Sequence, residues 1–125
     1  MNPFVSPQKA QAFASDWIAA WNSRDLDCIL KHYSPDVELS SPFVSRLINP
    51  NQNSVRGMAV LRVYFTRALN AYPDLCFTFQ QIYVGADSVI LQYNSVEGHV
   101  ASEMMKFDDA GLITQVYAHY SATSL

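Results

Sequence analysis

Hydrophobic residues in the first part of the chain recur every three to four positions, which is the period of an amphipathic helix. Between residues 7 and 22 this apolar stripe comprises Ala10, Phe13, Ala14, Trp17, Ile18 and Trp21. Ser6 and Pro7 precede it, and a capping hydroxyl followed by proline is typical of a helix start. We therefore predict a helix that begins at Pro7 and ends near Asn22.

Two further helices are predicted before the chain changes its period. Asp25 can cap a short helix that Pro35 ends, with an apolar face formed by Leu26, Ile29, Leu30 and Tyr33. A third helix follows Gly57, with an apolar face formed by Met58, Leu61, Tyr64, Phe65, Ala68, Leu69 and Tyr72. Pro73 ends this helix, so all three helices precede the C-terminal part of the chain.

Most other segments alternate between apolar and polar residues, which is the period of a strand. Strands are predicted over residues 36–41, 75–84, 88–96, 99–107 and 112–120. Short polar connections separate the last four strands, so these should form an antiparallel meander. Helices followed by a meander predict an α+β fold, a cone-shaped barrel in which a curved, mainly antiparallel sheet packs around three helices from the N-terminal half. The open end of such a cone is a natural ligand site.

Residues 42–57 form the longest stretch that follows neither period. At its centre, residues 49–53 read NPNQN, a composition typical of exposed turns. We predict an irregular loop with one of two roles: it folds over the mouth of the pocket, or it is a plain surface excursion.

Glu103 is the main candidate for chemistry because it is a carboxylate in an otherwise apolar strand. If it faces inward, it shares the inner surface with Ala101, Met105, Phe107, Val116, Ala118 and Tyr120. If the turn at Glu97-Gly98 has two residues, Gln92 and Asn94 join Glu103 in a polar cluster, which a register shift of one residue removes. The alternative for Glu103 is an ion pair with Arg or Lys, or a place on the outer face.

Composition narrows the partners and the location. The chain has 125 residues, which fits a single domain over residues 1–125. Its eight Lys and Arg are scattered and its net charge is −3, so we expect no nucleic-acid partner. Without a signal peptide or an apolar run of about 18 residues, we expect a cytoplasmic protein that does not bind membranes. The three His and two Cys lack ligand or redox spacing, so we expect no metal and no cofactor.

Several segments taken together resemble one known family. They read WIAAWN (residues 17–22), RDLD (24–27), YSPDVE (33–38) and MKFDDAGLI (105–113), with Gly57 before the third helix. The chain thereby resembles SnoaL-like proteins, which include polyketide cyclases and ketosteroid isomerases, in the nuclear transport factor 2-like superfamily. The resemblance implies a cone-shaped α+β barrel with an apolar pocket, often dimeric through the outer face of its sheet. It implies no single reaction, because the superfamily mixes enzymes with non-catalytic binders.

Four positions carry the chemistry that this resemblance implies. Glu103 stands where ketosteroid isomerases place a protonated acid, and Trp17 where they place a tyrosine that donates to the developing oxyanion. Their aspartate base corresponds to Ser41, and the aspartate that polyketide cyclases carry after the last strand corresponds to Ser121. The acid is therefore retained, whereas serine cannot take a carbon-bound proton without an activating partner.

Two functions are consistent with these observations. The first is a domain that binds a small apolar molecule and acts as an isomerase, cyclase or dehydratase, with Glu103 as acid or base. The alternative is a non-catalytic ligand-binding or dimeric accessory domain that has lost the family base at Ser41 and Ser121. Besides Glu103, the candidate pocket residues are Trp17, Tyr33, Ser41, Phe65, Asn94, Met105, Val116, Ala118 and Tyr120, of which the aromatic ones could instead be core residues. In either case we expect a homodimer whose interface includes Tyr117 and His119.

Overall fold

The first and the last long helices lie where the periodicity places them. The computed structural model describes residues 5–122. Helix α1 (Pro7–Ser23) begins at the predicted proline, and the Ser6 hydroxyl caps it by accepting a hydrogen bond from Lys9 N at 3.1 Å. Helix α4 (Met58–Ala71) corresponds to the third predicted helix and buries most of the predicted apolar face, namely Leu61, Tyr64, Phe65 and Leu69. Both predictions are confirmed.

The second helix is shorter than predicted. Asp25 caps helix α2 (Leu26–Leu30) as expected, but the helix ends before Tyr33. Tyr33 instead opens strand β1 (Tyr33–Ser40) and pairs with the last strand of the sheet. The prediction was wrong because the spacing of Tyr33 fits a helix face and a strand start equally well. Pro35 ends no helix; it lies inside β1, where the register of the strand shifts and an N–H can be spared.

The predicted irregular loop over residues 42–57 is also wrong in part. It contains helix α3 (Pro42–Leu47) and strand β2 (Ser54–Arg56). Ser41 caps α3 by accepting a hydrogen bond from Phe43 N at 3.2 Å, the same serine-proline start as in α1. The helix escaped detection because it is too short to show a period. The Phe43 ring is buried, so this segment is not a plain surface excursion.

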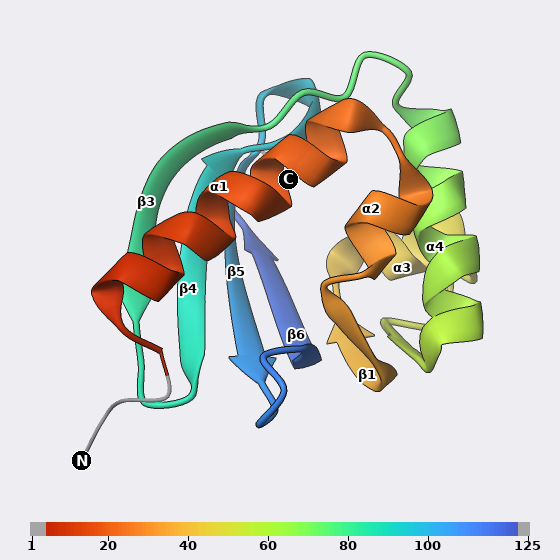
Figure 1. Ribbon diagram of the computed structural model, residues 1–125. Helices are drawn as coiled ribbons and strands as arrows, with labels where there is room; N and C mark the ends of the chain where they lie inside the picture. The colour runs from red at the N-terminus through yellow and green to blue at the C-terminus, as the bar shows by residue number, and fades with distance from the viewer. Residues whose placement is uncertain (1–4, 123–125) are drawn as a thin grey trace.

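Six strands form one curved, unclosed sheet in the order β2–β1–β6–β5–β4–β3 (Figure 1). The later elements are β3 (Thr78–Val84), β4 (Ser88–Asn94), the 3₁₀ helix η1 (Val96–Gly98), β5 (Val100–Phe107) and β6 (Ile113–Tyr120). Neighbouring strands are antiparallel except β1 and β6, which are parallel. Helix α1 crosses β3 and β4 on the concave side, and α4 packs against β1. The predicted α+β fold with a curved, mainly antiparallel sheet around the helices is therefore confirmed.

The register between β4 and β5 differs by one residue from the predicted one. The connection spans residues 95–99 instead of forming a two-residue turn, and Asn94 pairs with Val100. Since a shift of one residue exchanges the two faces of a strand, Tyr93 joins Glu103 on the inner face. Asn94 and Gln92 face outward, so the predicted polar cluster is not formed.

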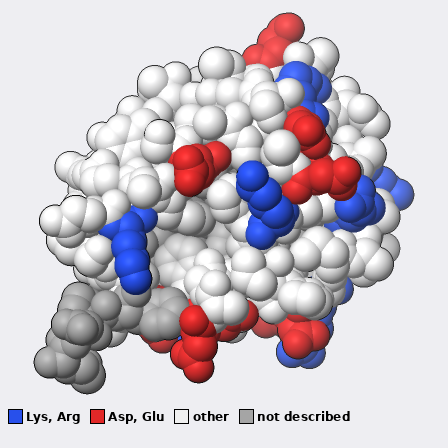
Figure 2. All heavy atoms as spheres, viewed as in Figure 1, with Lys and Arg blue, Asp and Glu red and all other residues white. Residues whose placement is uncertain are grey.

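Charged side chains are scattered over the surface. On the face shown in Figure 2, Lys and Arg lie among Asp and Glu without forming a continuous basic band. The ion pairs Arg56–Glu38, Arg62–Asp27 and Lys106–Asp87 all lie at the surface. Between residues 5 and 122, no helix has both the length and the apolar character needed to cross a membrane.

Candidate functional site

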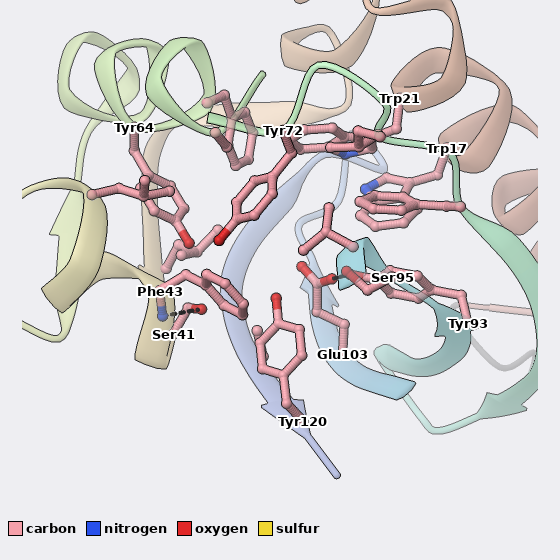
Figure 3. A pocket seen from close by; sticks show the side chains of 18 residues that line it. Trp17, Trp21, Ser41, Phe43, Tyr64, Tyr72, Tyr93, Ser95, Glu103 and Tyr120 are labelled. Atoms are coloured by element: carbon pink, nitrogen blue, oxygen red, sulfur yellow. Dashed lines mark hydrogen bonds between the residues drawn. The ribbon is translucent and has the colours of Figure 1, made fainter. Parts of the chain in front are cut away.

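A cavity of about 60 Å³ lies on the concave side of the sheet, beneath α1, α3 and α4 (Figure 3). Half of its lining residues are aromatic: Trp17, Trp21, Phe43, Tyr64, Phe65, Tyr72, Phe77, Tyr93 and Tyr120. The others are Leu39, Ser41, Leu47, Ala68, Leu75, Ser95, Val96, Glu103 and Ala118. The volume suits a few water molecules or a small organic group, because pockets for drug-sized ligands occupy about 300–1,000 Å³.

Glu103 is the only carboxylic acid among these lining residues, and no lining residue is basic. Strand β5 turns it inward, where it is 5% exposed. Tyr93 Oη donates a hydrogen bond to Glu103 Oε2 at 2.5 Å, and the other carboxyl oxygen points into the cavity (Figure 3). Burial raises the pKa of Glu103 to about 7, and the hydrogen bond from Tyr93 opposes part of that rise. The alternative of an ion pair with Arg or Lys is therefore wrong, since the partner of Glu103 is a neutral phenol.

Neutral hydroxyl groups also point into the cavity. Figure 3 shows the hydroxyls of Tyr64, Tyr72 and Tyr120 directed toward its interior, with Ser41 beside them. Burial raises the pKa of Tyr64 and of Tyr120; the Glu103 carboxylate adds to both rises, and the Ser41 hydroxyl opposes them. These phenols therefore stay protonated near neutral pH, and each can donate or accept a hydrogen bond without carrying charge.

Of the two indole N–H groups beside the cavity, one is engaged and the other is buried without a partner between residues 5 and 122. Trp17 Nε1 donates to Tyr33 Oη at 3.0 Å, so only the Trp17 ring faces the cavity. This ring stacks on Phe77 with 5.8 Å between centroids and meets Tyr93 edge-on at 5.2 Å. Trp21 Nε1 is buried and has no hydrogen-bond partner in the part of the chain that the structure describes. The donor that the resemblance places at Trp17 is thus already engaged.

The structure brings most of the predicted pocket residues together, in two layers. Those that line the cavity are Trp17, Ser41, Phe65, Glu103, Ala118 and Tyr120. Tyr33, Met105 and Val116 lie behind this wall, buried in the core. Asn94 lies on the outer face, where its Oδ1 accepts a hydrogen bond from Gln80 Nε2 at 2.7 Å. Its predicted place beside Glu103 is wrong for the reason of register given above.

Tyr93 is the most important residue that the sequence reasoning missed. The predicted turn length placed it on the outer face. The apolar positions of the strand carried the better signal, because Val89, Leu91 and Tyr93 alternate and all three are buried. Placing this apolar set inward would have put the phenol beside Glu103. Tyr64 was predicted only as part of the apolar face of a helix. No signal in the sequence shows that its hydroxyl points into a cavity.

The comparisons with known proteins agree on one family. The model of the SnoaL-like domain matches residues 14–116. No functionally curated protein matches the chain significantly. Among solved structures, a SnoaL-like protein of unknown function from Burkholderia thailandensis is 34% identical, with 97% of this chain and 100% of that chain covered and a TM-score of 0.91.

Two more distant structures share the fold alone. A protein of unknown function with a cystatin-like fold from Methylobium petroleophilum is 17% identical, with 94% of this chain and 79% of that chain covered and a TM-score of 0.72. The epoxide hydrolase/cyclase-like enzyme SalBIII, which has a role in pyran ring formation in the polyether salinomycin, is 14% identical, with 94% of each chain covered and a TM-score of 0.71.

Proposed function

This chain belongs to the SnoaL-like domain family, and on that premise we propose that it is an enzyme that isomerises or cyclises a small, mainly apolar molecule bearing an oxygen function. Glu103 would act as both proton donor and proton acceptor. The supporting observation is that Glu103 is the single carboxylic acid of the cavity and that burial raises its pKa to about 7. A group with such a pKa holds and releases a proton with comparable ease near neutral pH.

A single carboxyl group suits reactions that return the proton they use. In an isomerisation or a cyclisation, Glu103 gives a proton to one substrate atom and takes a proton from another, so it ends the cycle as it began. Hydrolysis would also need a base to activate water, and Ser41 cannot serve as one without a partner. Tyr93 holds Oε2, which leaves Oε1 to exchange the proton with the substrate. The fold neighbour with a role in pyran ring formation is consistent with this class, although its similarity extends to the fold only.

The dimensions of the cavity limit the reacting part of the substrate. A cavity of about 60 Å³ admits a small group. Tyr72, Leu75 and Val96 line both the cavity and a hollow at the surface, so the rest of a larger molecule would extend past them. Inside, the hydroxyls of Tyr64 and Tyr120 can hold a neutral oxygen in place. The proposed substrate is therefore small, or it presents a small end to Glu103.

A non-catalytic ligand-binding domain is the second candidate. It is favoured by Ser41, which lines the cavity at the position of the family base. A protein that only binds its ligand needs no base, and it could retain Glu103 as a hydrogen-bonding group. The two candidates differ in turnover and not in binding.

Assays of two active-site variants and one control test the proposal. The protein is incubated with small hydroxy-epoxides and β,γ-unsaturated ketones, and the products are followed by NMR from pH 5 to pH 9. We expect Glu103→Gln to lower kcat/KM by about 10²–10⁴-fold, because it removes the group that transfers the proton. Tyr93→Phe should displace the pH profile to higher pH, because it removes the hydrogen bond that lowers the pKa of Glu103.

The control variant is Glu38→Gln, on the outer face of β1, which should leave the rate unchanged. Turnover that survives Glu103→Gln intact would refute the role given to Glu103. Binding of these compounds to the wild-type protein without any turnover would favour the non-catalytic candidate.

A further inference from the structure

The cavity and a surface hollow beside it are lined by acidic side chains and by no basic ones. The cavity lining contains Glu103 and no Lys, Arg or His. The adjoining surface hollow shares part of this lining and adds Asp74 and Glu97, again without a basic residue. The charged side chains that line the cavity and this hollow are therefore all acidic, which disfavours a carboxylate or a phosphate group.

The arginines close to the cavity wall are engaged elsewhere. Arg24 donates hydrogen bonds to the backbone oxygens of Leu69 at 2.6 Å and Tyr72 at 3.1 Å. Arg46 lies over the ring of Phe43, with 4.8 Å between its guanidinium carbon and the ring centroid. Glu103 thus has no cationic partner among the described residues. One aromatic ring of the cavity wall, that of Phe43, therefore already contacts a cation, the Arg46 guanidinium.

The aromatic lining attracts positive charge from inside as well. Aromatic rings stabilise cations through their π faces, most strongly where the ion is desolvated. An oxyanion, in contrast, needs preorganised donors. Trp17 Nε1 is unavailable, because it donates to Tyr33, and Trp21 Nε1 is buried without a hydrogen-bond partner among the described residues. The remaining donors are phenols and serines, which are equally able to accept.

We infer that the reaction proposed above passes through a positively charged state of the substrate, which the aromatic rings and the Glu103 carboxylate stabilise. The inference rests on the proposed function and adds the sign of the charge. The inference favours substrates that become cationic when protonated, such as strained or allylic ethers with an internal hydroxyl. It disfavours ketones, which react through enolates.

The corresponding step is balanced without any co-reactant. The proton on Glu103 Oε1 moves to the ether oxygen of the substrate. The bond from that oxygen to carbon breaks, and its electron pair stays on the oxygen. An internal hydroxyl oxygen then bonds to the cationic carbon and loses its proton to the Glu103 carboxylate. The product is an isomer of the substrate, and Glu103 is protonated again.

Three isosteric probes of different charge test the inference on the wild-type protein. Choline carries a quaternary ammonium group, 3,3-dimethylbutan-1-ol is its neutral isostere, and 3,3-dimethylbutanoate is an anion of similar shape. Binding is measured by calorimetry and by the fluorescence of Trp17 and Trp21, which line the cavity. We expect choline to bind at least about tenfold more tightly than the neutral isostere at pH 8, and the anion to bind most weakly.

The preference for choline should decrease as the pH falls from 8 to 6, because Glu103 then takes up its proton. The titratable groups that face Glu103 are the phenols of Tyr33, Tyr64, Tyr93 and Tyr120, which stay neutral in this range. Glu103→Gln should lose most of the preference while still binding the neutral isostere, which shows that its cavity is intact. Glu38→Gln should keep the preference unchanged.

Three outcomes would overturn the inference. They are equal or tighter binding of the neutral isostere, a preference for choline that survives Glu103→Gln unchanged, and no binding of any probe. Each of them can occur while Glu103-dependent turnover of β,γ-unsaturated ketones persists. In that case the proposed acid–base function stands and its intermediate is an enolate.

Discussion

Replacing Glu103 by glutamine should make the protein more stable at alkaline pH. Burial raises the pKa of this carboxyl from the ordinary 4.5 to about 7, so the folded state favours the protonated form. The folded protein therefore binds more protons than the unfolded chain between these two pH values, and its stability falls as the pH rises. Glutamine is a neutral isostere whose carbonyl can still accept the hydrogen bond from Tyr93, so it avoids this loss.

The size of the effect follows from the pKa. A rise in pKa from 4.5 to about 7 corresponds to about 3 kcal/mol, since one pKa unit is worth about 1.4 kcal/mol. The free energy of unfolding of Glu103→Gln should thus be close to that of the wild type below pH 4.5. It should exceed the wild-type value by up to about 3 kcal/mol at pH 8. A glutamate held in an ion pair behaves in the opposite way, because the pair lowers its pKa.

Urea unfolding from pH 4 to pH 8 measures this difference. The midpoint concentration reports the change in stability, provided that the slope of the transition stays the same in both proteins. Subtracting the two curves cancels the titration of the other carboxylates. Glu38→Gln, a glutamate on the outer face of β1, should give a difference that varies by less than about 1 kcal/mol. If the difference in the free energy of unfolding between the wild type and Glu103→Gln is constant with pH, the reasoning is refuted. Glu103 would then have the same pKa in the folded and the unfolded state.

Two further predictions concern the core and the outer surface. Trp17→Ala should destabilise the protein by about 3–5 kcal/mol in urea unfolding, because Trp17 is 1% exposed, and a loss below about 1 kcal/mol would contradict its place in the core. The homodimer expected from the sequence should form through the outer sheet face, where Tyr83 on β3, Ile90 on β4 and Tyr117 on β6 are exposed in one row across the sheet. Sedimentation should then show a dimer that Tyr117→Lys converts to a monomer, and a wild type that stays monomeric at all concentrations would contradict the prediction.

The fold was predictable because long periodic segments leave little freedom. Helices α1 and α4 each show three or more turns of apolar spacing, and the four C-terminal strands alternate between clear turn residues. The errors concern short segments. Helix α3 is too short for a period to emerge, and Tyr33 could belong to either a helix or a strand. In both places, contacts with distant parts of the chain determine the secondary structure, and the local sequence pattern does not predict those contacts.

The candidate site was less predictable than the fold, because it depends on single residues. The inward direction of Glu103 followed from alternation alone. Its neighbours depended on the length of the β4–β5 connection. A shift of one residue in the register between these strands places Tyr93 beside Glu103 in place of Asn94. An amide beside Glu103 would have left the carboxyl in a polar cluster. The phenol leaves it in an aromatic one, where burial raises the pKa of Glu103 and the hydrogen bond from Tyr93 lowers it in part.

Ser41 explains why this cavity holds a single charge. Its hydroxyl caps α3, and α3 in turn places Phe43 over the cavity. An aspartate at this position could also cap the helix, because its carboxylate accepts the same backbone hydrogen bond. It would, however, bring a second carboxylate into a cavity without any cation, where the phenols of Tyr64 and Tyr120 already lie. Like charges in a buried site raise each other's pKa, so one of the two acids would stay protonated. A serine there preserves the helix cap and leaves Glu103 to titrate alone, which is the condition under which one group can both give and recover the proton.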